Sequence, residues 1–342
     1  MAVTRKSIHA TLNGPEVSRL PRKTIAHGAA ARPVAPAPSP TGSTLHHGRT
    51  IVSIDGHDVI ECAVCGFCHS DPLVSDEDLK KFYGGTFYEE CSEYFRYAEE
   101  DKEWAMLRYG YYFEKLESLT EGRRLLDIGS GPGYFLEAAR ERGWQVLGFE
   151  PSTIAAQYTS ARGIPVINDF YSAGKAQDLG KFDVISLNLV LEHLRDPISL
   201  IDDAKRILAP GGLLFVTVPN DFNPLQMQLW QDHGFAPWWV VPKHHLNYFN
   251  PGSLKRLFAS RNMETVHQET SYPMELFLLE GRNYVGNFPL GRECHKQRKA
   301  FEIALLRSNL PLMQAVSRTW SEQSIGRECI IIGRNPASSC PP

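Results

Sequence analysis

"LLDIGSGPGYFLEAARERGWQVLGFEPS", residues 125–152, places three glycines within five residues, between an apolar run and a segment with helical periodicity. The run "RRLLDIG" is typical of a buried parallel strand, and "YFLEAARERG" spaces its apolar residues as a helix does before ending at Gly143. We therefore predict a strand, a glycine-rich turn and a helix. Such a turn lets a ligand approach the backbone, and the helix N-terminus offers it free N–H groups.

An acidic residue follows the next apolar run. "WQVLGF" reads as a second strand, and Glu150 stands at its carboxyl end. A carboxylate at that position can accept two hydrogen bonds from a ribose diol. The pair of features predicts a cofactor that contains adenosine.

The glycine spacing separates two cofactor classes. Dinucleotide sites use G-x-G-x-x-G, whereas this turn reads G-x-G-x-G with Pro132 inside it and Tyr134 at the last glycine position. Asp127, two residues before the first glycine, would repel a pyrophosphate but suits a ligand with an ammonium group. S-adenosylmethionine has a ribose diol, an ammonium group and no phosphate, so it fits best. An NAD-dependent oxidoreductase and an unrelated α/β turn are the alternatives.

The stretch resembles the first two motifs of the class I S-adenosylmethionine-dependent methyltransferases. Further segments follow in that family's order. "GIPVIND" ends a third strand at Asn168 and Asp169, where the family hydrogen-bonds the adenine amine. Residues 182–220 then supply a fourth strand, a helix, a Pro-Gly-Gly turn and a fifth strand, and "ECIIIGRN", residues 328–335, closes the sheet.

The resemblance, which covers about residues 60–335, implies an α/β fold. We expect a Rossmann-like, mostly parallel sheet of seven strands whose last strand is antiparallel, with a small N-terminal subdomain and an aromatic-rich acceptor-side insertion. In this family the end of the fourth strand borders the reacting methyl group. The cofactor-binding residues implied are Asp127, Gly129, Ser130, Gly131, Gly133, Glu150, Pro151, Asn168, Asp169, Asn188 and Leu189.

The composition is that of an ordinary enzyme and excludes several other classes. A chain of 342 residues with 42% hydrophobic residues can bury one large core and a smaller subdomain. The net charge of -3 predicts no nucleic-acid partner, and the absence of an apolar run of 18 residues predicts no membrane span. Seven cysteines, an odd number, favour a reducing compartment, the cytoplasm, over a disulfide framework.

Composition also divides the chain. Residues 1–44 are rich in Ala and Pro and basic, which predicts a disordered leader, with a transit peptide as the alternative. We expect an N-terminal subdomain over residues 45–121, the methyltransferase domain over 122–335, and a short tail over 336–342. The helix expected at about residues 99–119 is interpreted as a packing helix under the sheet rather than as part of a substrate site.

The N-terminal subdomain contains a cysteine-rich segment. Its candidate zinc ligands are Cys62, Cys65, Cys68 and His69. No second Cys-x-x-Cys pair stands apart from this segment, so His46, His47 or His57 would have to complete a site. The segment resembles an element of some bacterial methyltransferases that are often linked to surface polysaccharide or secondary metabolite pathways. We favour a metal-free knuckle of reduced thiols, with zinc as the alternative.

The acceptor-side segment, at about residues 221–250, is dense in aromatic residues and histidines. Its tryptophans, Trp230, Trp238 and Trp239, suit either the wall of an acceptor pocket or a hydrophobic cover over the sheet. Its histidines are His233, His244 and His245. "HHLNYF" resembles a recurrent element of the same methyltransferase group, close to the acceptor side. We therefore interpret the histidines as functional rather than structural residues.

Methyl transfer to oxygen or nitrogen requires a proton acceptor as well as alignment. We predict His245 as this base, with His193 second and no histidine base as the third possibility. Glu192 and His193 resemble a metal-binding pair of a quinone-modifying methyltransferase, but Leu189 replaces a further carboxylate, so we predict no catalytic metal. The acceptor is an oxygen, nitrogen or carbon of a small molecule or sugar. A non-catalytic cofactor-binding module is the other function considered, and the sequence leaves the oligomeric state open.

Overall fold

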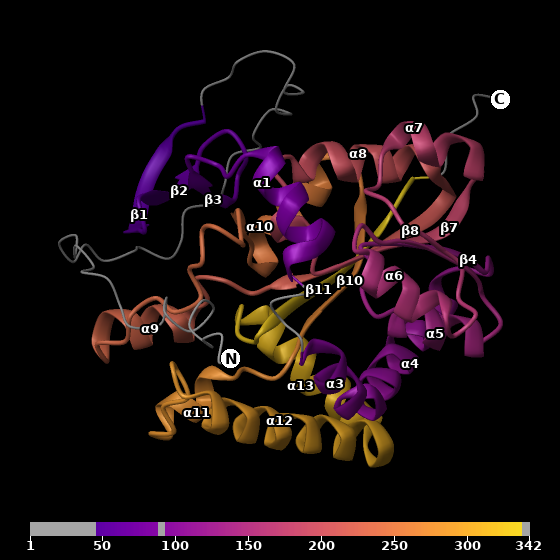
Figure 1. Ribbon diagram of the computed structural model, residues 1–342. Helices are drawn as coiled ribbons and strands as arrows, with labels where there is room; N and C mark the ends of the chain where they lie inside the picture. The colour runs from indigo at the N-terminus through magenta and orange to yellow at the C-terminus, as the bar shows by residue number, and fades with distance from the viewer. Residues whose placement is uncertain (1–45, 88–92, 337–342) are drawn as a thin grey trace, which may run out of the picture.

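The structure is a computed structural model, and it describes residues 46–87 and 93–336. The predicted leader, residues 1–44, lies outside the described residues, as does the predicted tail except for residue 336. Two sheets organise the described residues, one of seven strands and one of four (Figure 1).

The seven-stranded sheet confirms the predicted fold class. Its strands, in spatial order, are β10 (Glu264–Thr270), β11 (Glu328–Arg334), β8 (Leu208–Pro219), β7 (Phe182–Asn188), β4 (Arg124–Ile128), β5 (Gln145–Phe149) and β6 (Val166–Ile167). β11 runs antiparallel to both of its neighbours, and the other neighbouring pairs are parallel. The result is a doubly wound α/β sheet whose last strand in the chain is the antiparallel one, as in class I methyltransferases.

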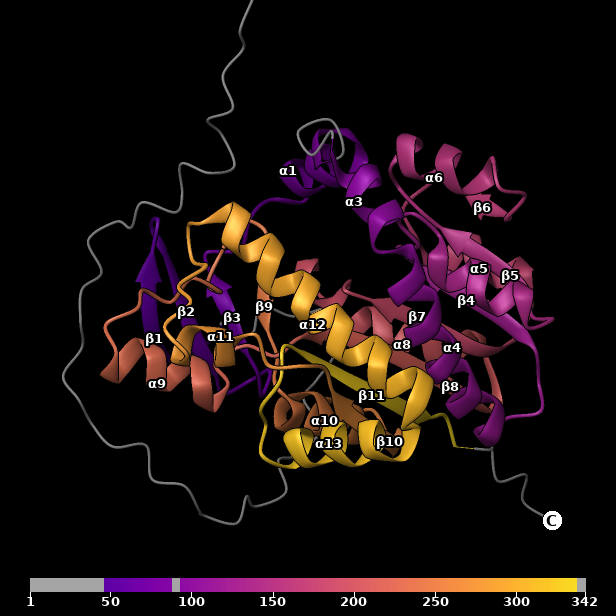
Figure 2. The ribbon, with the colours of Figure 1, turned by 90° about the horizontal axis from the view of Figure 1, so that it is seen from below.

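Helices cover both faces of this sheet. The longer helices among the described residues are α4 (Lys102–Leu119), α5 (Tyr134–Glu141), α6 (Thr153–Ser160), α8 (Pro197–Ile207), α9 (Pro224–Asp232), α10 (Pro251–Ser260), α12 (Phe288–Ser308) and α13 (Leu310–Glu322), of which α9 packs against the small sheet. The shorter ones are α1 (Asp76–Lys81), η2 (Phe82–Thr86), α3 (Tyr94–Glu100), α7 (Ala173–Ala176), η3 (Gln177–Leu179), η4 (Leu191–His193) and α11 (Glu275–Leu279). Figure 2 shows α4 and α12 on the near side of the sheet.

Alternation along the strands divides the core into two layers. On β4, Leu126 packs into one buried cluster and Leu125 into the other, because successive side chains of a strand point to opposite faces. The Leu126 cluster continues into α8 and α10, and the Leu125 cluster into α4 and α5. The helix predicted at about residues 99–119 is present as the end of α3 and α4, and it packs as expected, with Phe113 and Leu116 fully buried.

The four-stranded sheet joins two distant parts of the chain. Its antiparallel strands are β1 (Gly48–Ile54), β2 (His57–Cys62), β3 (Cys68–Asp71) and β9 (Asn247–Tyr248). Both views show β1, β2 and β3 to one side of the large sheet (Figures 1 and 2). Because β9 follows β8 in the chain, the N-terminal segment is fixed to the acceptor-side segment through backbone hydrogen bonds.

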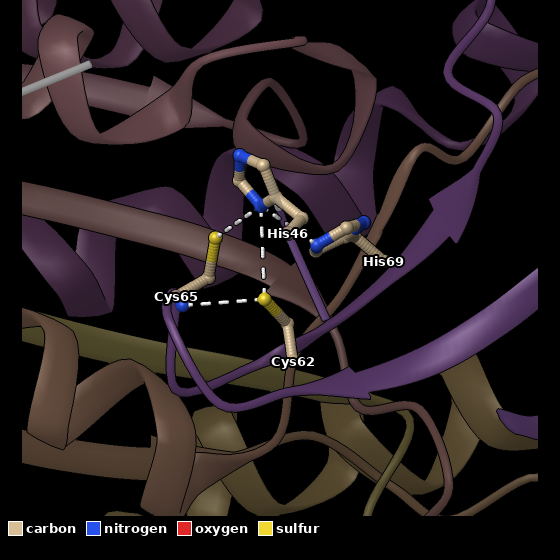
Figure 3. Close-up of side chains that lie close together, drawn as sticks. All are labelled: His46, Cys62, Cys65 and His69. Carbon is tan, nitrogen blue, oxygen red and sulfur yellow. Dashed lines mark hydrogen bonds between the residues drawn. The ribbon is translucent and has the colours of Figure 1, made fainter. Parts of the chain in front are cut away.

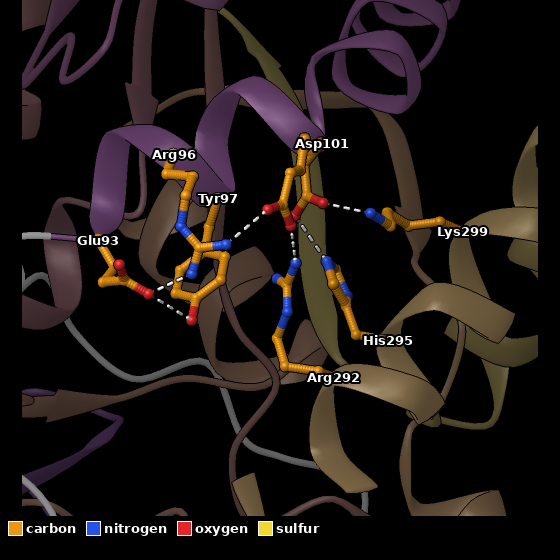
Figure 4. Close-up of polar contacts among 8 residues, drawn as sticks. Glu93, Arg96, Tyr97, Asp101, Arg292, His295 and Lys299 are labelled. Carbon is orange, nitrogen blue, oxygen red and sulfur yellow. Dashed lines mark hydrogen bonds and ion pairs between the residues drawn. The ribbon is translucent and has the colours of Figure 1, made fainter. Parts of the chain in front are cut away.

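Asp101, between α3 and α4, ties these helices to α12 (Figure 4). Its carboxylate accepts from His295 Nε2 at 2.8 Å and pairs with Lys299, and the neighbouring Glu100 pairs with Arg292. Burial by itself would raise the pKa of Asp101, but the hydrogen bonds from His295 and Lys299 outweigh it and hold the pKa at about 2. Across the described part of the chain, no helix is both long enough and apolar enough to cross a membrane.

Asp101→Asn should lower the free energy of unfolding by about 2 kcal/mol at neutral pH, because the carboxylate loses its ion pair with Lys299 and its hydrogen bond from His295. The folded pKa lies below the ordinary value of 3.8, so the contribution is complete above pH 4 and disappears as pH falls from about 4 to about 2. Denaturant unfolding of both proteins at pH 7 and pH 3 measures this. Glu93→Gln, in an exposed pair with Arg96, is the control and should leave stability unchanged. Equal stability of Asp101→Asn and wild type at pH 7 would contradict the assignment.

Candidate functional site

One cavity of about 1620 Å³ opens along the carboxyl ends of β4, β5 and β7. The predicted site residues that line it are Asp127, Gly129, Ser130, Gly131, Glu150, Pro151, Asn188, Leu189, His193 and His245. Residues that the sequence places up to 118 positions apart, from Asp127 to His245, therefore share one space. This edge is where doubly wound sheets bind their ligands.

The glycine-rich turn has the backbone that its sequence predicts. Gly129, Gly131 and Gly133 have φ values of 74°, 50° and 73°. A Cβ on Gly129 would lie 2.8 Å from the Val190 side chain, and one on Gly133 would lie 2.4 Å from Thr159. Gly133 is not among the cavity-lining residues. Its role in this structure is to let α5 begin close to Thr159, whereas Gly129 and Gly131 border the cavity.

Glu150 stands at the end of β5 and faces the turn. Its Oε2 accepts from the Gly131 N–H at 2.7 Å and its Oε1 from the Ser152 N–H at 2.8 Å. Burial raises the pKa of this carboxyl, and the two backbone bonds oppose the rise. Each carboxylate oxygen keeps a second lone pair, so the geometry leaves room for a ribose diol.

Asp127 and Ser130 form the polar floor of the cavity beside the turn. The Asp127 carboxylate accepts from Ser186 Oγ at 2.6 Å and from Asn188 Nδ2 at 3.4 Å, and no cation of the described residues contributes to its pKa. Burial raises its pKa to about 7, which the hydrogen bonds from Ser186 and Asn188 oppose. Ser130 Oγ is buried and has no hydrogen-bond partner among the described residues. An uncompensated acid and an unsatisfied hydroxyl suit a ligand with an ammonium group.

Asn168 and Asp169, predicted at the adenine amine, are placed differently. Neither lines the cavity, and Phe170, Tyr171 and Ser172 line it instead. Asn168 Nδ2 donates to the carbonyls of Glu150 and Pro151 at 3.0 and 3.2 Å, and Asp169 pairs with Lys175. In this structure Asn168 therefore links the end of β6 to the end of β5, and Asp169 pairs with α7, so neither side chain lines the cavity.

Leu189 lines the cavity at the end of β7. It follows β7 with a φ of 55°, a left-handed value that is strained for leucine, and 44% of its surface is exposed. The Leu189 N–H donates to the Thr217 carbonyl at 2.9 Å, which fixes this backbone. Strain of this kind often accompanies a functional site because the surrounding structure must maintain it.

A cluster of ionisable side chains borders the cavity beyond Leu189. His193 Nδ1 lies 2.8 Å from the His244 carbonyl and 2.7 Å from Tyr83 Oη, and its Nε2 lies 3.7 Å from Glu192 Oε1. The His245 ring centroid lies 5.0 Å from that of His193. Burial lowers the pKa of His193 to about 4 and that of His245 to about 3, and it raises the pKa of Glu192.

This cluster can also be read as a metal site. Glu192, His193 and His245 each offer a ligand atom, and these atoms lie within 4.8 Å of one another. The set contains a single carboxylate, and the His193 ring is already fixed through its Nδ1. Its chemistry therefore fits proton transfer between imidazoles and a carboxyl at least as well as it fits a hard divalent cation.

The tryptophans of the acceptor-side segment divide between the two roles considered. Trp238 lines the cavity, whereas Trp239 is buried in the core of the small sheet and Trp230 packs against that core. His233 is exposed at the end of α9, away from the cavity, while His244 lines it. The density of aromatic residues and histidines in the sequence does not show which of them line the cavity. Their directions depend on a segment that is largely neither helix nor strand.

Several cavity residues were missed by the sequence analysis. They come from the N-terminal segment and are Leu79, Lys80, Phe82, Tyr83, Phe87 and Tyr94. Tyr83 contacts His193, so α1 and η2 line the same part of the cavity as the histidine cluster. The concentration of aromatic residues in "FYGGTF", residues 82–87, was the available signal.

The order of the sheet, the glycine-rich turn and the acid after β5 together define a class I S-adenosylmethionine-dependent methyltransferase. The family described as a methyltransferase domain matches residues 94–268, just over half of the chain. The chain belongs to this methyltransferase family. It is thus a methyltransferase that uses S-adenosylmethionine, and the oxidoreductase and non-catalytic alternatives are not supported.

Curated relatives match a shorter stretch. The ubiquinone biosynthesis O-methyltransferase of Actinobacillus pleuropneumoniae serotype 7 (strain AP76) is 35% identical over 124 residues, which are 33% of this chain and 53% of the relative. That of Escherichia coli (strain K12 / DH10B) is 32% identical over 120 residues, 33% of this chain and 50% of the relative. The chain spans about half the length of the curated relatives it matches.

Solved structures with similar folds include a SAM-dependent methyltransferase from Archaeoglobus fulgidus. It is 16% identical, with a TM-score of 0.46, and the match covers 70% of this chain and 99% of that one. The plantazolicin methyltransferase BpumL in complex with SAH and a monoazolic desmethylPZN analog is 14% identical, with a TM-score of 0.47, and the match covers 76% of this chain and 94% of that one.

Glu150→Gln should weaken S-adenosylhomocysteine binding by on the order of 2 kcal/mol, or roughly thirtyfold in Kd, because the charge-assisted bonds to the ribose diol are lost. Glutamine keeps the size of the side chain and an oxygen for one of the two backbone N–H groups. Titration calorimetry measures the affinity, with exposed Glu141→Gln as the control. An unchanged Kd in Glu150→Gln would remove the ribose assignment.

Asp127 should make cofactor binding depend on pH. Its pKa of about 7 means that the free enzyme is partly protonated there, and a bound ammonium group favours the ionised form. Affinity for S-adenosylhomocysteine should therefore fall by up to about tenfold per pH unit below pH 7, with proton release on binding. Calorimetry at pH 6, 7 and 8, in buffers of different ionisation enthalpy, measures both. Asp127→Asn should bind more weakly and without this dependence, and a wild-type Kd that is equal at pH 6 and pH 8 would refute the assignment.

Proposed function

We propose that this methyltransferase transfers the methyl group to a hydroxyl oxygen of an uncharged small molecule with an aromatic or apolar body. The observation that carries the proposal is the end of the cavity beyond Leu189, where an imidazole pair lies within a largely aromatic wall. Relatives named as O-methyltransferases support oxygen as the acceptor atom. A sugar acceptor is the second candidate carried over from the sequence.

The division of the cavity into two parts supports a separate acceptor region. Drug-sized ligands occupy pockets of about 300–1,000 Å³, so a cavity of about 1620 Å³ has room for a cofactor and a second molecule. We assign the part beside β4 and β5 to the cofactor, held by Asp127, Ser130 and Glu150 together with the backbone from Gly129 to Gly131. Pro151 and the segment from Phe170 to Ser172 then border the adenine.

The charges around the cavity favour an acceptor without a phosphate. Among the described lining residues, Lys80, Arg195 and Lys243 are cationic, while six side chains are acidic. The acidic ones are Asp55, Asp76, Asp127, Glu150, Asp196 and Asp203. Because acids outnumber cations, a phosphorylated acceptor would meet net repulsion. Aromatic faces from Phe82, Tyr94 and Trp238 instead suit an apolar ring.

The chemistry requires alignment, exclusion of water and removal of one proton. S-adenosylmethionine supplies an activated methyl group, to which the acceptor oxygen bonds as the bond to sulfur breaks. We propose that Leu189 and the aromatic wall align the acceptor and exclude water, and that His245 accepts the hydroxyl proton. His245 Nδ1 is buried and has no partner within the described part of the protein, so an acceptor hydroxyl would satisfy it.

Glu192 and His193 are assigned supporting roles. The His193 ring is oriented by the His244 carbonyl and Tyr83, and it lies against both Glu192 and His245. A proton on His245 would make ionisation of Glu192 more favourable, because opposite charges close together stabilise each other. We assign no metal to this cluster, and added Mg²⁺ should leave turnover unchanged.

We also propose a division of the chain into two parts and a relationship to a group of bacterial methyltransferases. The first is the division at about residues 45–121 and 122–335, to which β9 adds a strand from the acceptor-side segment. The second is a relationship to the bacterial methyltransferases that carry a Cys-x-x-Cys-Gly element, which the turn at residues 62–66 supports.

The acceptor is found by incubating the purified enzyme with radiolabelled S-adenosylmethionine and matched sets of phenols, amines and free and phosphorylated sugars. Label transfer to phenolic or other uncharged hydroxyl compounds, with little to the phosphorylated ones, is the expected result. Transfer only to amines or only to phosphorylated sugars would overturn the proposed acceptor class without affecting the cofactor assignment.

The base is tested with His245→Asn and His193→Asn, assayed with the identified acceptor. His245→Asn should bind S-adenosylhomocysteine normally while kcat falls by roughly 100-fold or more. Because burial lowers the pKa of His245 to about 3, the neutral imidazole predominates above that pH. The acidic limb of the wild-type profile of kcat/KM for the acceptor, measured at saturating S-adenosylmethionine so that Asp127 does not contribute, should therefore lie below pH 6.5 and disappear in His245→Asn. Near-normal turnover with an intact limb would contradict the assignment, and a larger loss in His193→Asn would transfer it to His193.

A further inference from the structure

Four side chains from the small sheet and the segments next to its strands converge on one point, and none of them lines the cavity (Figure 3). They are His46, Cys62, Cys65 and His69, and their ligand atoms all lie within 4.8 Å of one another. Cys68, which the sequence included in this set, is not part of it. Neighbouring residues of β3 face opposite ways, so His69 points to the cluster while Cys68 packs against the core around Val52 and Trp239.

The distances match the edges of a metal-centred tetrahedron. His46 Nδ1 lies 3.1 Å from His69 Nε2, 3.6 Å from Cys62 Sγ and 3.2 Å from Cys65 Sγ. Zinc at its usual bond lengths separates two nitrogens by about 3.3 Å and a nitrogen from a sulfur by about 3.6 Å. The three distances from His46 are thus close to those between ligands of a single small ion, and all four ligand atoms lie within 4.8 Å of one another.

Hydrogen bonds around the cluster orient its members as ligands. His69 Nδ1 lies 2.9 Å from the Ser70 carbonyl and donates to it, which leaves the lone pair of Nε2 facing the cluster. The Cys65 N–H points to Cys62 Sγ at 3.4 Å. A single proton on His46 Nδ1 cannot serve His69 and both sulfurs at once, whereas one ion bonds to all four atoms.

The local backbone is shaped to bring these residues together. Gly66, with a φ of 76°, donates its N–H to the Cys62 carbonyl at 3.0 Å and closes a tight turn after the second cysteine. Gly48 pairs with Cys62, and a Cβ on Gly48 would lie 2.0 Å from the Glu61 carbonyl oxygen. The Ala63 N–H donates to the His47 carbonyl at 2.9 Å. These contacts hold His46 over the cysteine turn.

We propose that His46, Cys62, Cys65 and His69 bind one Zn²⁺ in a structural, tetrahedral site. Two thiolates and two imidazoles in this geometry select zinc among the common divalent ions. A two-iron cluster on Cys and His ligands needs ligand pairs on separate irons, and the 4.8 Å spread is too compact for that. The sequence favoured a metal-free knuckle because it lacked a second cysteine pair, and the two histidines take the place of that pair.

The position of the site explains what the metal would stabilise. His69 pairs with Asn247 of β9, and Asn247 Nδ2 donates to the carbonyls of Leu191 and Leu194 at 2.9 and 2.6 Å. The Leu246 N–H donates to the Glu192 carbonyl at 2.6 Å. Zinc would thus hold β3, and through it the backbone around Glu192, without taking part in cofactor binding.

The test measures metal on the full-length protein purified without chelator. Elemental analysis should give about one zinc per chain, and His46→Asn and Cys65→Ser should each fall below about 0.2 per chain. Cobalt added to apoprotein should give the absorption of tetrahedral Co²⁺ with two sulfur ligands, which does not depend on catalytic activity. Cys68→Ala, at a cysteine outside the cluster, is the matched control and should keep its zinc.

Hydrogen exchange distinguishes a structural zinc from zinc that is bound adventitiously. Removing zinc should speed amide exchange in residues 246–248 by at least about tenfold, while the affinity for S-adenosylhomocysteine stays unchanged. Less than about 0.2 zinc per chain in wild type after zinc supplementation would overturn the proposal. So would a disulfide between Cys62 and Cys65, or equal zinc loss in Cys68→Ala.

Discussion

The parallel pairing of β6, β5, β4, β7 and β8 is the constraint on which the rest of the structure depends. Parallel strands end along the same edge, so the residues that follow each strand are brought together whatever their distance in the chain. The glycine-rich turn after β4, Glu150 after β5 and Leu189 after β7 share one cavity for this reason. Glu150 and Leu189 line this cavity because the strands before them are buried, and a buried strand cannot shift its register by one residue without exposing its apolar side chains.

A second sheet completes the cavity on its acceptor side. β3 and β9 come from residues about 180 positions apart, and their pairing places the N-terminal segment beside the loop that carries His244 and His245. Tyr83 then reaches His193 from the segment that follows β3. The part of the cavity proposed for the acceptor is thus assembled from three separate stretches of chain, and the part proposed for the cofactor from the strand ends of one sheet. This difference in construction fits a fold that keeps one cofactor while its acceptors vary.

Burial of ionisable groups accompanies both regions. Asp127 is buried with no cation beside it among the described residues, and its pKa is raised to about 7, whereas the half-buried Asp101 has a pKa held at about 2 by hydrogen bonds from His295 and Lys299 of α12. Asp101 is thus a stabilising contact within the protein, whereas Asp127 has the raised pKa that is common at sites where a ligand binds. Glu192 and His245 follow the first pattern, since each has a buried polar atom without a partner among the described residues. A buried polar atom without a hydrogen-bond partner lowers stability, so its presence beside a cavity suggests a role in binding or catalysis.

The sequence by itself determined the class of fold, the cofactor loop and Glu150, because these depend on short segments whose periodicity and glycine spacing act locally. It did not determine β10, whose segment "ETVHQET" is too polar to read as a strand until it pairs with β11. Tertiary structure likewise decided three side-chain placements. Trp238 lines the cavity whereas Trp239 is buried, Asn168 points toward β5, and His46 rather than Cys68 joins the cysteine cluster. In each case a side chain's direction depends on a partner distant in sequence, such as the close approach at Gly48 that places His46 over the cysteine turn. Local pattern specifies which residues can serve a site, and only long-range packing specifies which of them meet.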